Sequence, residues 1–118
     1  MKSRICLFGF VSAMLMSNVN AQTQQELSQA LLGQLLGFTQ NVYFNANQIA
    51  EMPKMPTERA ATQPEILAAV ASALRLQQHP CSSVLNADYV DESVIIMISI
   101  NCVDGNYVVD ARRGKINP

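Results

Sequence analysis

Hydrophobic residues between positions 24 and 50 return every three or four residues, which is the repeat of one face of an α-helix. Seven residues form this face: Leu27, Leu31, Leu35, Phe38, Val42, Ala46 and Ile49. The pattern predicts a long amphipathic helix, although Asn45 and Asn47 are poor helix formers and make its last turns less secure. Two prolines in the segment 52–56 end the helix, because proline disfavours helical geometry in the residue before it.

A second helix is predicted to begin at Thr62. The threonine hydroxyl can cap the helix, Pro64 suits its first turn, and Glu65 lies three residues after Thr62, which completes a capping box. Pro80 stops the helical pattern. Apolar and small residues run down one side of this helix: Ile66, Leu67, Ala69, Val70, Ala73 and Leu74.

From residue 81 onward the hydrophobic repeat changes to two, which is the repeat of a β-strand with one buried face. Between residues 93 and 103 the predicted buried face consists of Val94, Ile96, Ile98, Ile100 and Cys102. Asp104-Gly105 is a strong signal for a two-residue hairpin turn, and Asp91-Glu92 is a weaker one. The chain therefore predicts an α+β fold, in which two N-terminal helices pack on a three-stranded antiparallel β-meander.

The two turns also predict which residues lie opposite each other in neighbouring strands. A turn at Asp104-Gly105 places Cys102 opposite Tyr107, and a turn at Asp91-Glu92 places Cys102 opposite Cys81. Residues opposite each other in antiparallel strands have Cβ atoms about 4.5–5.5 Å apart, close to the reach of a disulfide. The register therefore predicts a disulfide between Cys81 and Cys102. The predicted register also adds five residues to the buried face: Leu85, Ala87, Tyr89, Tyr107 and Val109.

The first 21 residues have the three parts of a secretory signal peptide. Lys2 and Arg4 give a positive start, an uncharged apolar run extends from residue 5 to residue 16, and Val19 and Ala21 suit cleavage after Ala21. The apolar run has 12 residues, whereas a membrane-spanning helix needs roughly 20, which disfavours the alternative of a retained anchor. We predict a signal peptide over 1–21, a single domain over 22–118, and a periplasmic or secreted location.

Removal of the signal changes the composition of the chain. Without the first 21 of its 118 residues, the mature chain has 97 residues, which is enough for one domain. Cys6 leaves with the signal, and the two remaining cysteines of an exported chain most simply form a disulfide. Six of the eight Lys and Arg residues remain against nine Asp and Glu, a net charge of −3. This charge argues against nucleic-acid binding and against stable association with an anionic membrane.

Few residues of the mature chain offer catalytic or metal-binding chemistry. His79 is the one histidine, and its place at a helix end is explained by a favourable interaction with the helix dipole. Asp88, Asp91 and Glu92 cluster without the spacing of a calcium loop, which favours a solvated turn. The basic cluster 112–115 is either a solvated end or a contact for an acidic partner. We expect no catalytic residue, no cofactor and no metal.

The chain has more apolar residues than the predicted core requires. The second face of the sheet is half apolar where it should be solvated, and the first helix has apolar residues on more than one side. Eight residues form the candidate interface: Ile95, Met97, Val103, Val108, Leu32, Leu36, Tyr43 and Phe44. Burial in the core is the alternative explanation for them.

The chain ends in a strand that leads into Asp110, Ala111, Gly114 and Ile116. This ending resembles that of PepSY-like domains, which often finish with a strand running into Asp-Ala-x-Thr-Gly and an apolar residue. An arginine stands before Gly114 where threonine is usual, and the resemblance covers residues 62–116 only. It implies a non-catalytic binding or protease-modulating module and transfers no catalytic residue.

These observations predict an exported, non-enzymatic protein-binding or accessory module of the cell envelope, of which an inhibitor is one form. Its partner would be another envelope or secreted protein, with a homo-oligomer left open. The alternative is a carrier of a small apolar ligand, with a pocket between the helices and the sheet. A hydrolase that uses the clustered carboxylates is the third and least favoured candidate.

Overall fold

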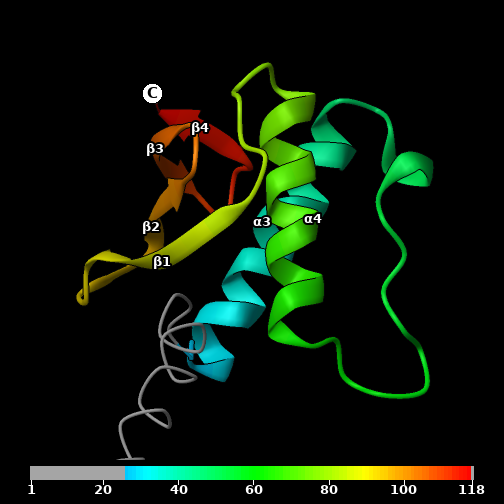
Figure 1. Cartoon of the computed structure of the whole chain (residues 1–118), viewed down its shortest axis with the longest axis horizontal. Helices are drawn as coiled ribbons and strands as arrows, with labels where there is room; N and C mark the ends of the chain where they lie inside the picture. Colours follow the sequence, from blue (N-terminus) through cyan, green and yellow to red (C-terminus); the bar gives the residue numbers. More distant parts are fainter. Residues whose placement is uncertain (1–25, 118) are drawn as a thin grey trace, which may run out of the picture.

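The computed structural model describes residues 26–117, so the predicted signal peptide over 1–21 lies outside the described residues. Two helices precede a four-stranded antiparallel sheet of strand order β1-β2-β3-β4 (Figure 1). The elements are α3 (Gln29–Asn45), a 3-10 turn (Ile49–Glu51), α4 (Gln63–Leu76), β1 (Val84–Asp91), β2 (Val94–Cys102), β3 (Gly105–Asp110) and β4 (Lys115–Asn117). The α+β class is confirmed, whereas the predicted number of three strands is wrong.

Both helices begin at side-chain caps. The Ser28 hydroxyl accepts the backbone N–H of Leu31 at 3.1 Å and starts α3. The capping box predicted at Thr62 is present, because Glu65 accepts the N–H of Thr62 at 2.8 Å while the Thr62 hydroxyl accepts the N–H of Glu65. The first helix ends earlier than its hydrophobic repeat, and Asn47 beyond its end has a positive φ of 61°.

The core lies between the helices and one face of the sheet. Phe38 of α3, Leu74 of α4 and Ile98 of β2 have no exposed surface. The hydroxyl of the buried Thr39 donates to the carbonyl of Leu35 in the preceding turn at 3.0 Å, so this polar group has a hydrogen-bond partner inside the core. The helical stripe and the strand alternation therefore meet in a single hydrophobic core.

The pairing of β2 with β3 differs from the prediction by two residues. The observed pairs include Ile98 with Val109, Ile100 with Tyr107 and Cys102 with Gly105. The turn residues are therefore Val103 and Asp104, not Asp104 and Gly105. Asp104 is held in this turn by Ser82, whose N–H and hydroxyl donate to Asp104 Oδ2 at 2.6 and 2.8 Å. Because the difference is an even number, these side chains keep their predicted faces.

The pairing of β1 with β2 contains two register shifts, so the single predicted register is wrong. Cys102 lies opposite Val84 rather than Cys81. The predicted disulfide is nevertheless present, with Cα atoms 5.4 Å apart. The segment before β1 stays beside the end of β2, because the N–H of Val103 donates to the carbonyl of Ser83 at 3.0 Å.

The turn between β3 and β4 is held against α3 by two asparagines. Asn41 Nδ2 donates to the carbonyls of Ala111 and Arg112, at 3.0 and 2.9 Å. Asn45 Nδ2 donates to the carbonyl of Arg113 at 2.7 Å. The last strand of the sheet is thus fixed by polar contacts from the helix layer.

Candidate functional site

Leu32 and Tyr43 belong to the core and not to an interface, which corrects the prediction for these two residues. Both are buried, and the Tyr43 hydroxyl hydrogen-bonds the Ser72 hydroxyl of α4. The reason is that α3 packs against α4 as well as facing the sheet, so it is buried on more than one side (Figure 1). Leu36, further along the same helix, is partly exposed.

Ile95, Met97 and Val108 gather on the face of the sheet opposite the helices, here called the outer face. Met97 and Val108 alternate with the buried Ile98 and Val109, so they point away from the core. Ile95 lies two positions before Met97 along the same strand. Two other candidates lie apart from this group and are exposed, Val103 in the β2–β3 turn and Phe44 in the last turn of α3.

The far end of the β1–β2 hairpin projects beyond the rest of the sheet. Strand β3 pairs with β2 only as far as Met97, and Tyr89 of β1 still lies opposite Ile98, so residues 90–96 form a two-stranded extension, here called the arm (Figure 1). Val90, Val94 and Ile95 in the arm are 55%, 40% and 51% exposed. A two-stranded hairpin is marginally stable in water by itself. The arm therefore offers apolar surface whose burial by another surface is favourable.

Sequence alone does not single out Val90 or Val94 as surface residues. Val94 lies on the predicted buried face of its strand, but the helices do not extend over the arm (Figure 1). Alternation along a strand indicates two faces and does not indicate where the covering layer ends.

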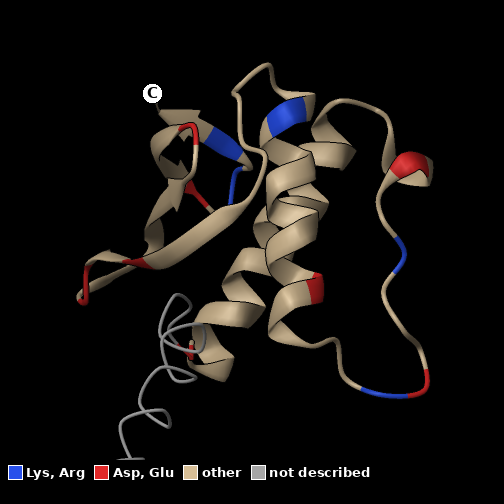
Figure 2. Cartoon of the chain, in the orientation of Figure 1, with Lys and Arg blue, Asp and Glu red and all other residues tan. Residues whose placement is uncertain are grey.

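The arm is acidic at its tip. Asp91 and Glu92 lie there with Asp88 just before the arm, and residues 84–102 contain no Lys, Arg or His (Figure 2). Ser93 donates its N–H and its hydroxyl to Asp91 Oδ1, at 3.0 and 2.9 Å. These hydrogen bonds lower the pKa of the Asp91 carboxyl and keep it charged. Neither ion pair in the described part of the chain involves these three carboxylates.

A group of opposite charge lies at the base of the arm. Arg112, Arg113 and Lys115, here called the basic turn, are exposed where β3 connects to β4 (Figure 2). The N–H of Ala111 donates to the carbonyl of Ile96 at 2.8 Å, which places the basic turn beside the start of the arm. The two ends of the arm thus carry opposite charge.

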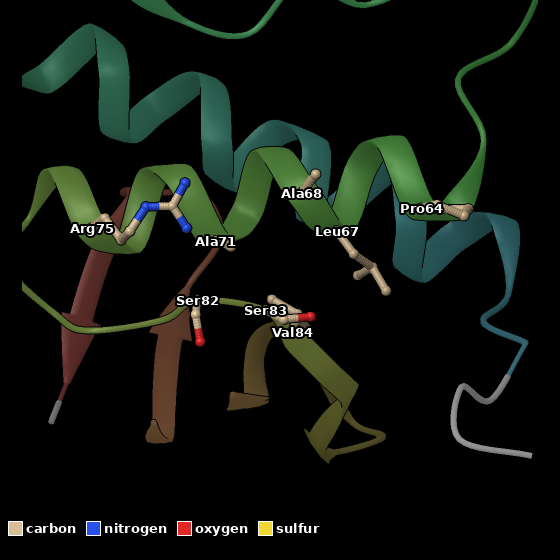
Figure 3. A pocket seen from close by; sticks show the side chains of 8 residues that line it. All are labelled: Pro64, Leu67, Ala68, Ala71, Arg75, Ser82, Ser83 and Val84. Atoms are coloured by element: carbon tan, nitrogen blue, oxygen red, sulfur yellow. The ribbon is translucent and has the colours of Figure 1, made fainter. Parts of the chain in front are cut away.

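A groove of about 270 Å³ separates α4 from the segment that leads into β1 (Figure 3). Its lining consists of Pro64, Leu67, Ala68, Ala71, Arg75, Ser82, Ser83 and Val84. Arg75 lies along the groove and donates through Nη1 to the carbonyl of Cys81 at 2.7 Å. A guanidinium and two serines beside small apolar side chains suit a small polar ligand better than a wholly apolar one.

His79 packs edge-on against Tyr107, with ring centroids 5.3 Å apart. It also lines a second hollow of about 290 Å³, together with Asn45, Gln77, Gly114, Lys115 and Ile116. Within residues 26–117, no three His, Cys, Asp or Glu side chains are grouped so that they could hold a metal ion. None of the helices described is both long and apolar enough to cross a membrane.

No family model, curated protein or solved structure matches this chain. The resemblance to PepSY-like domains therefore stays a prediction. Two of its residues have structural roles here: Asp110 Oδ1 accepts the N–H groups of Arg112 and Arg113, and Gly114 has a positive φ of 68°. Both features shape the β3–β4 turn. The fold therefore explains why these two residues are present, and no function shared with PepSY-like domains is needed to explain them.

Proposed function

We propose that this protein is an exported, non-enzymatic protein-binding or accessory module whose partner is another envelope or secreted protein. One observation carries the proposal. Met97 and Val108, both partly exposed, lie beside the exposed Ile95 on the outer face, and no helix or strand of the described chain covers them (Figure 1). The disulfide is compatible with export.

The polar residues around this apolar group suit a specific protein contact. Asn86 lies opposite Asn101, which in turn lies opposite Asn106, so three amide side chains cross the outer face in one row. Asn86 Oδ1 is buried and has no hydrogen-bond partner. An apolar group beside amide donors and acceptors resembles the composition of protein interfaces, in which burial supplies affinity and hydrogen bonds supply specificity.

Crosslinking in the native host tests the proposal. A C-terminally tagged copy would be crosslinked, captured and analysed by mass spectrometry, beside a Met97→Asp variant and a Val108→Asp variant. We expect one stoichiometric envelope or secreted protein with the unmodified chain, and at least a tenfold loss with each variant, because burying an unpaired carboxylate is unfavourable.

Leu85→Asp is the matched control, since Leu85 is also an exposed apolar strand residue but lies near the other end of β1. Circular dichroism would confirm that all three variants are folded. If both outer-face variants still capture the partner protein, the proposal is contradicted. It is also contradicted if the captured sample contains no protein other than this one.

The alternative function, a carrier of a small ligand, would use the groove between α4 and β1. The observation in its favour is the size of the groove together with Leu67, Ala71 and Val84 in its lining. Native mass spectrometry of protein purified from its host would show a bound small molecule, and Ala68→Trp, at the exposed alanine of the groove lining, would displace it. A measured mass equal to that of the polypeptide alone would exclude the carrier function.

A further inference from the structure

We propose that the arm binds the arm of a second copy of this chain, in an antiparallel pair related by a two-fold axis. In this pair the acidic tip of each arm lies over the basic turn at the base of the other arm. The proposal goes beyond the proposed function, because it assigns the arm, including Ile95, to self-association and leaves Met97 and Val108 of the outer face to a different partner.

Charge decides between the two ways in which identical arms can meet. Side by side in the same direction, Asp91 and Glu92 of one copy would face Asp91 and Glu92 of the other, and like charges repel. In the antiparallel arrangement the same carboxylates face Arg112 and Arg113 of the other copy. Asp91 and Glu92 have no ion pair within the described chain. In the basic turn, Arg113 pairs with Asp110 of its own copy at 3.8 Å, whereas Arg112 and Lys115 are exposed without an ion pair in the described chain and supply the missing charge.

The length of the arm fits this arrangement. Only three residues of β2, from 94 to 96, separate the tip from the last pair with β3, which corresponds to roughly 10 Å of strand. Two arms of equal length that overlap fully in opposite directions bring each tip to the base of the other. The arm points away from both helices, so they do not obstruct a second copy (Figure 1).

The apolar residues of the arm lie between its two charged ends. Tyr89 lies opposite the buried Ile98, so the neighbouring Val90 points to the other side of the arm, as Ile95 does. Val90 and Ile95 would therefore meet their equivalents near the two-fold axis, where a central apolar contact forms with charged groups at its rim. Val94 points to the opposite side and stays outside this contact. Such a contact also supplies the additional packing that a two-stranded hairpin lacks. A second copy thus accounts for the exposure of Val90 and Ile95 and for both charged groups together.

Sedimentation velocity of the purified, exported protein tests the proposal without any other partner. We expect a monomer–dimer equilibrium in the micromolar range. The association constant should fall at least tenfold between about 0.1 M and about 1 M salt, over which the Debye length shrinks from about 10 Å to about 3 Å. Val90→Asp should also abolish the dimer, whereas Val103→Asp, at an equally exposed valine in the β2–β3 turn, should leave it intact.

Two variants with reversed charges test whether the acidic tip of one copy meets the basic turn of the other. One variant carries Asp91→Lys and Glu92→Lys, and the other carries Arg112→Glu and Arg113→Glu. Each variant alone should be monomeric because its tip and base have the same charge. An equimolar mixture should form a one-to-one heterodimer, in which both contacts are again between opposite charges.

Three results would overturn the proposal: a wild-type monomer at all concentrations up to the millimolar range, charge variants that still form homodimers, or a mixture that stays monomeric. Arm variants that leave the mass unchanged but prevent capture of a host protein would overturn it as well, since the arm would then serve a different partner. None of these results bears on the outer face, which is tested by Met97→Asp and Val108→Asp.

Discussion

Cys102 is bonded to Cys81 but lies opposite Val84 in the sheet, so the disulfide joins the end of β2 to a residue three positions before β1. Both cysteines are buried in the core. The bond therefore fixes the segment between α4 and β1 to the sheet, in addition to closing the β1–β2 hairpin. The lining of the groove beside α4 depends on this segment, because Ser82 and Ser83 belong to it.

Replacing both cysteines by alanine should destabilise the protein by about 3 kcal/mol, because the bond closes a loop over a separation of 21 residues. Urea unfolding followed by circular dichroism measures this loss. A reducing agent should lower the midpoint of the unmodified protein to that of the variant and leave the variant unchanged. A reductant-insensitive midpoint in the unmodified protein would show that the disulfide does not stabilise the fold.

Gly114 has no side chain where α3 passes the β3–β4 turn, and any larger residue there would collide with the helix. A Cβ atom would lie 2.8 Å from the carbonyl carbon of Asn41 and 2.9 Å from the backbone nitrogen of Val42. Since the residue also has a positive φ of 68°, Gly114→Ala should cost at least about 2 kcal/mol, from left-handed strain and overpacking together.

Gly33→Ala is the matched control, because a Cβ atom at Gly33 in α3 would meet no atom within 4 Å. This change should stabilise the protein by about 0.5–1 kcal/mol, the usual gain when alanine replaces glycine inside a helix. Thermal unfolding of both variants beside the parent protein measures the two effects. Equal melting temperatures for Gly114→Ala and the parent would show that the turn and the helix can separate without loss.

The strands could be predicted from the sequence, but their register could not. Alternation placed Ile98 and Ile100 on the buried face, because that pattern depends only on the period of the strand. The pairing depends on which two residues form each turn, and the Asp104 contact with Ser82 lies outside the local sequence pattern. Register shifts in β1 likewise leave Leu85 exposed and bury Val84 in its place.

The exposure of the candidate interface residues could be predicted only in part, for a reason of the same kind. Ile95 and Phe44 are exposed as expected, because Ile95 lies on the strand face opposite the core and Phe44 lies outside the helix stripe that faces the core. Tyr43 is buried because α4 packs beside α3, and that contact joins residues far apart in the chain. The fourth strand was missed because it has three residues, and its position depends on contacts of its turn with Asn41.

The start of α4 should make stability depend on pH in the acid range. The Arg59 guanidinium hydrogen-bonds the Glu65 carboxylate through two contacts of 2.9 Å, and with the N–H of Thr62 it lowers the pKa of Glu65 from 4.5 to about 2. Because the pKa is lower in the folded chain, Glu65 stabilises the fold above its unfolded pKa. This stabilisation is lost as the pH falls from about 4.5 to about 2.

The Glu65→Gln variant isolates this contribution. The difference in unfolding free energy between the parent and the variant should shrink steadily as the pH falls from about 5 to about 2. Arg59→Gln should reduce the pH dependence in the same window, since it removes the strongest partner of the carboxylate. Urea unfolding at several pH values measures both effects, and parallel stability curves for the parent and Glu65→Gln would contradict this account.

The arm should open locally more often than the rest of β2. Ile98 and Ile100 are covered by the helices and paired on both sides, whereas Val94 and Ile95 lie beyond the end of β3. Few buried contacts and exposed backbone hydrogen bonds lower the free energy of local opening. In a dilute, monomeric sample, hydrogen exchange should therefore be fastest in residues 90–96 of the sheet. At concentrations that favour the dimer, the same residues should gain protection while the core strands stay unchanged. Equal protection of Ile95 and Ile100 in the dilute sample would mean that the arm is held by a contact within the monomer, which would remove the need for a second copy.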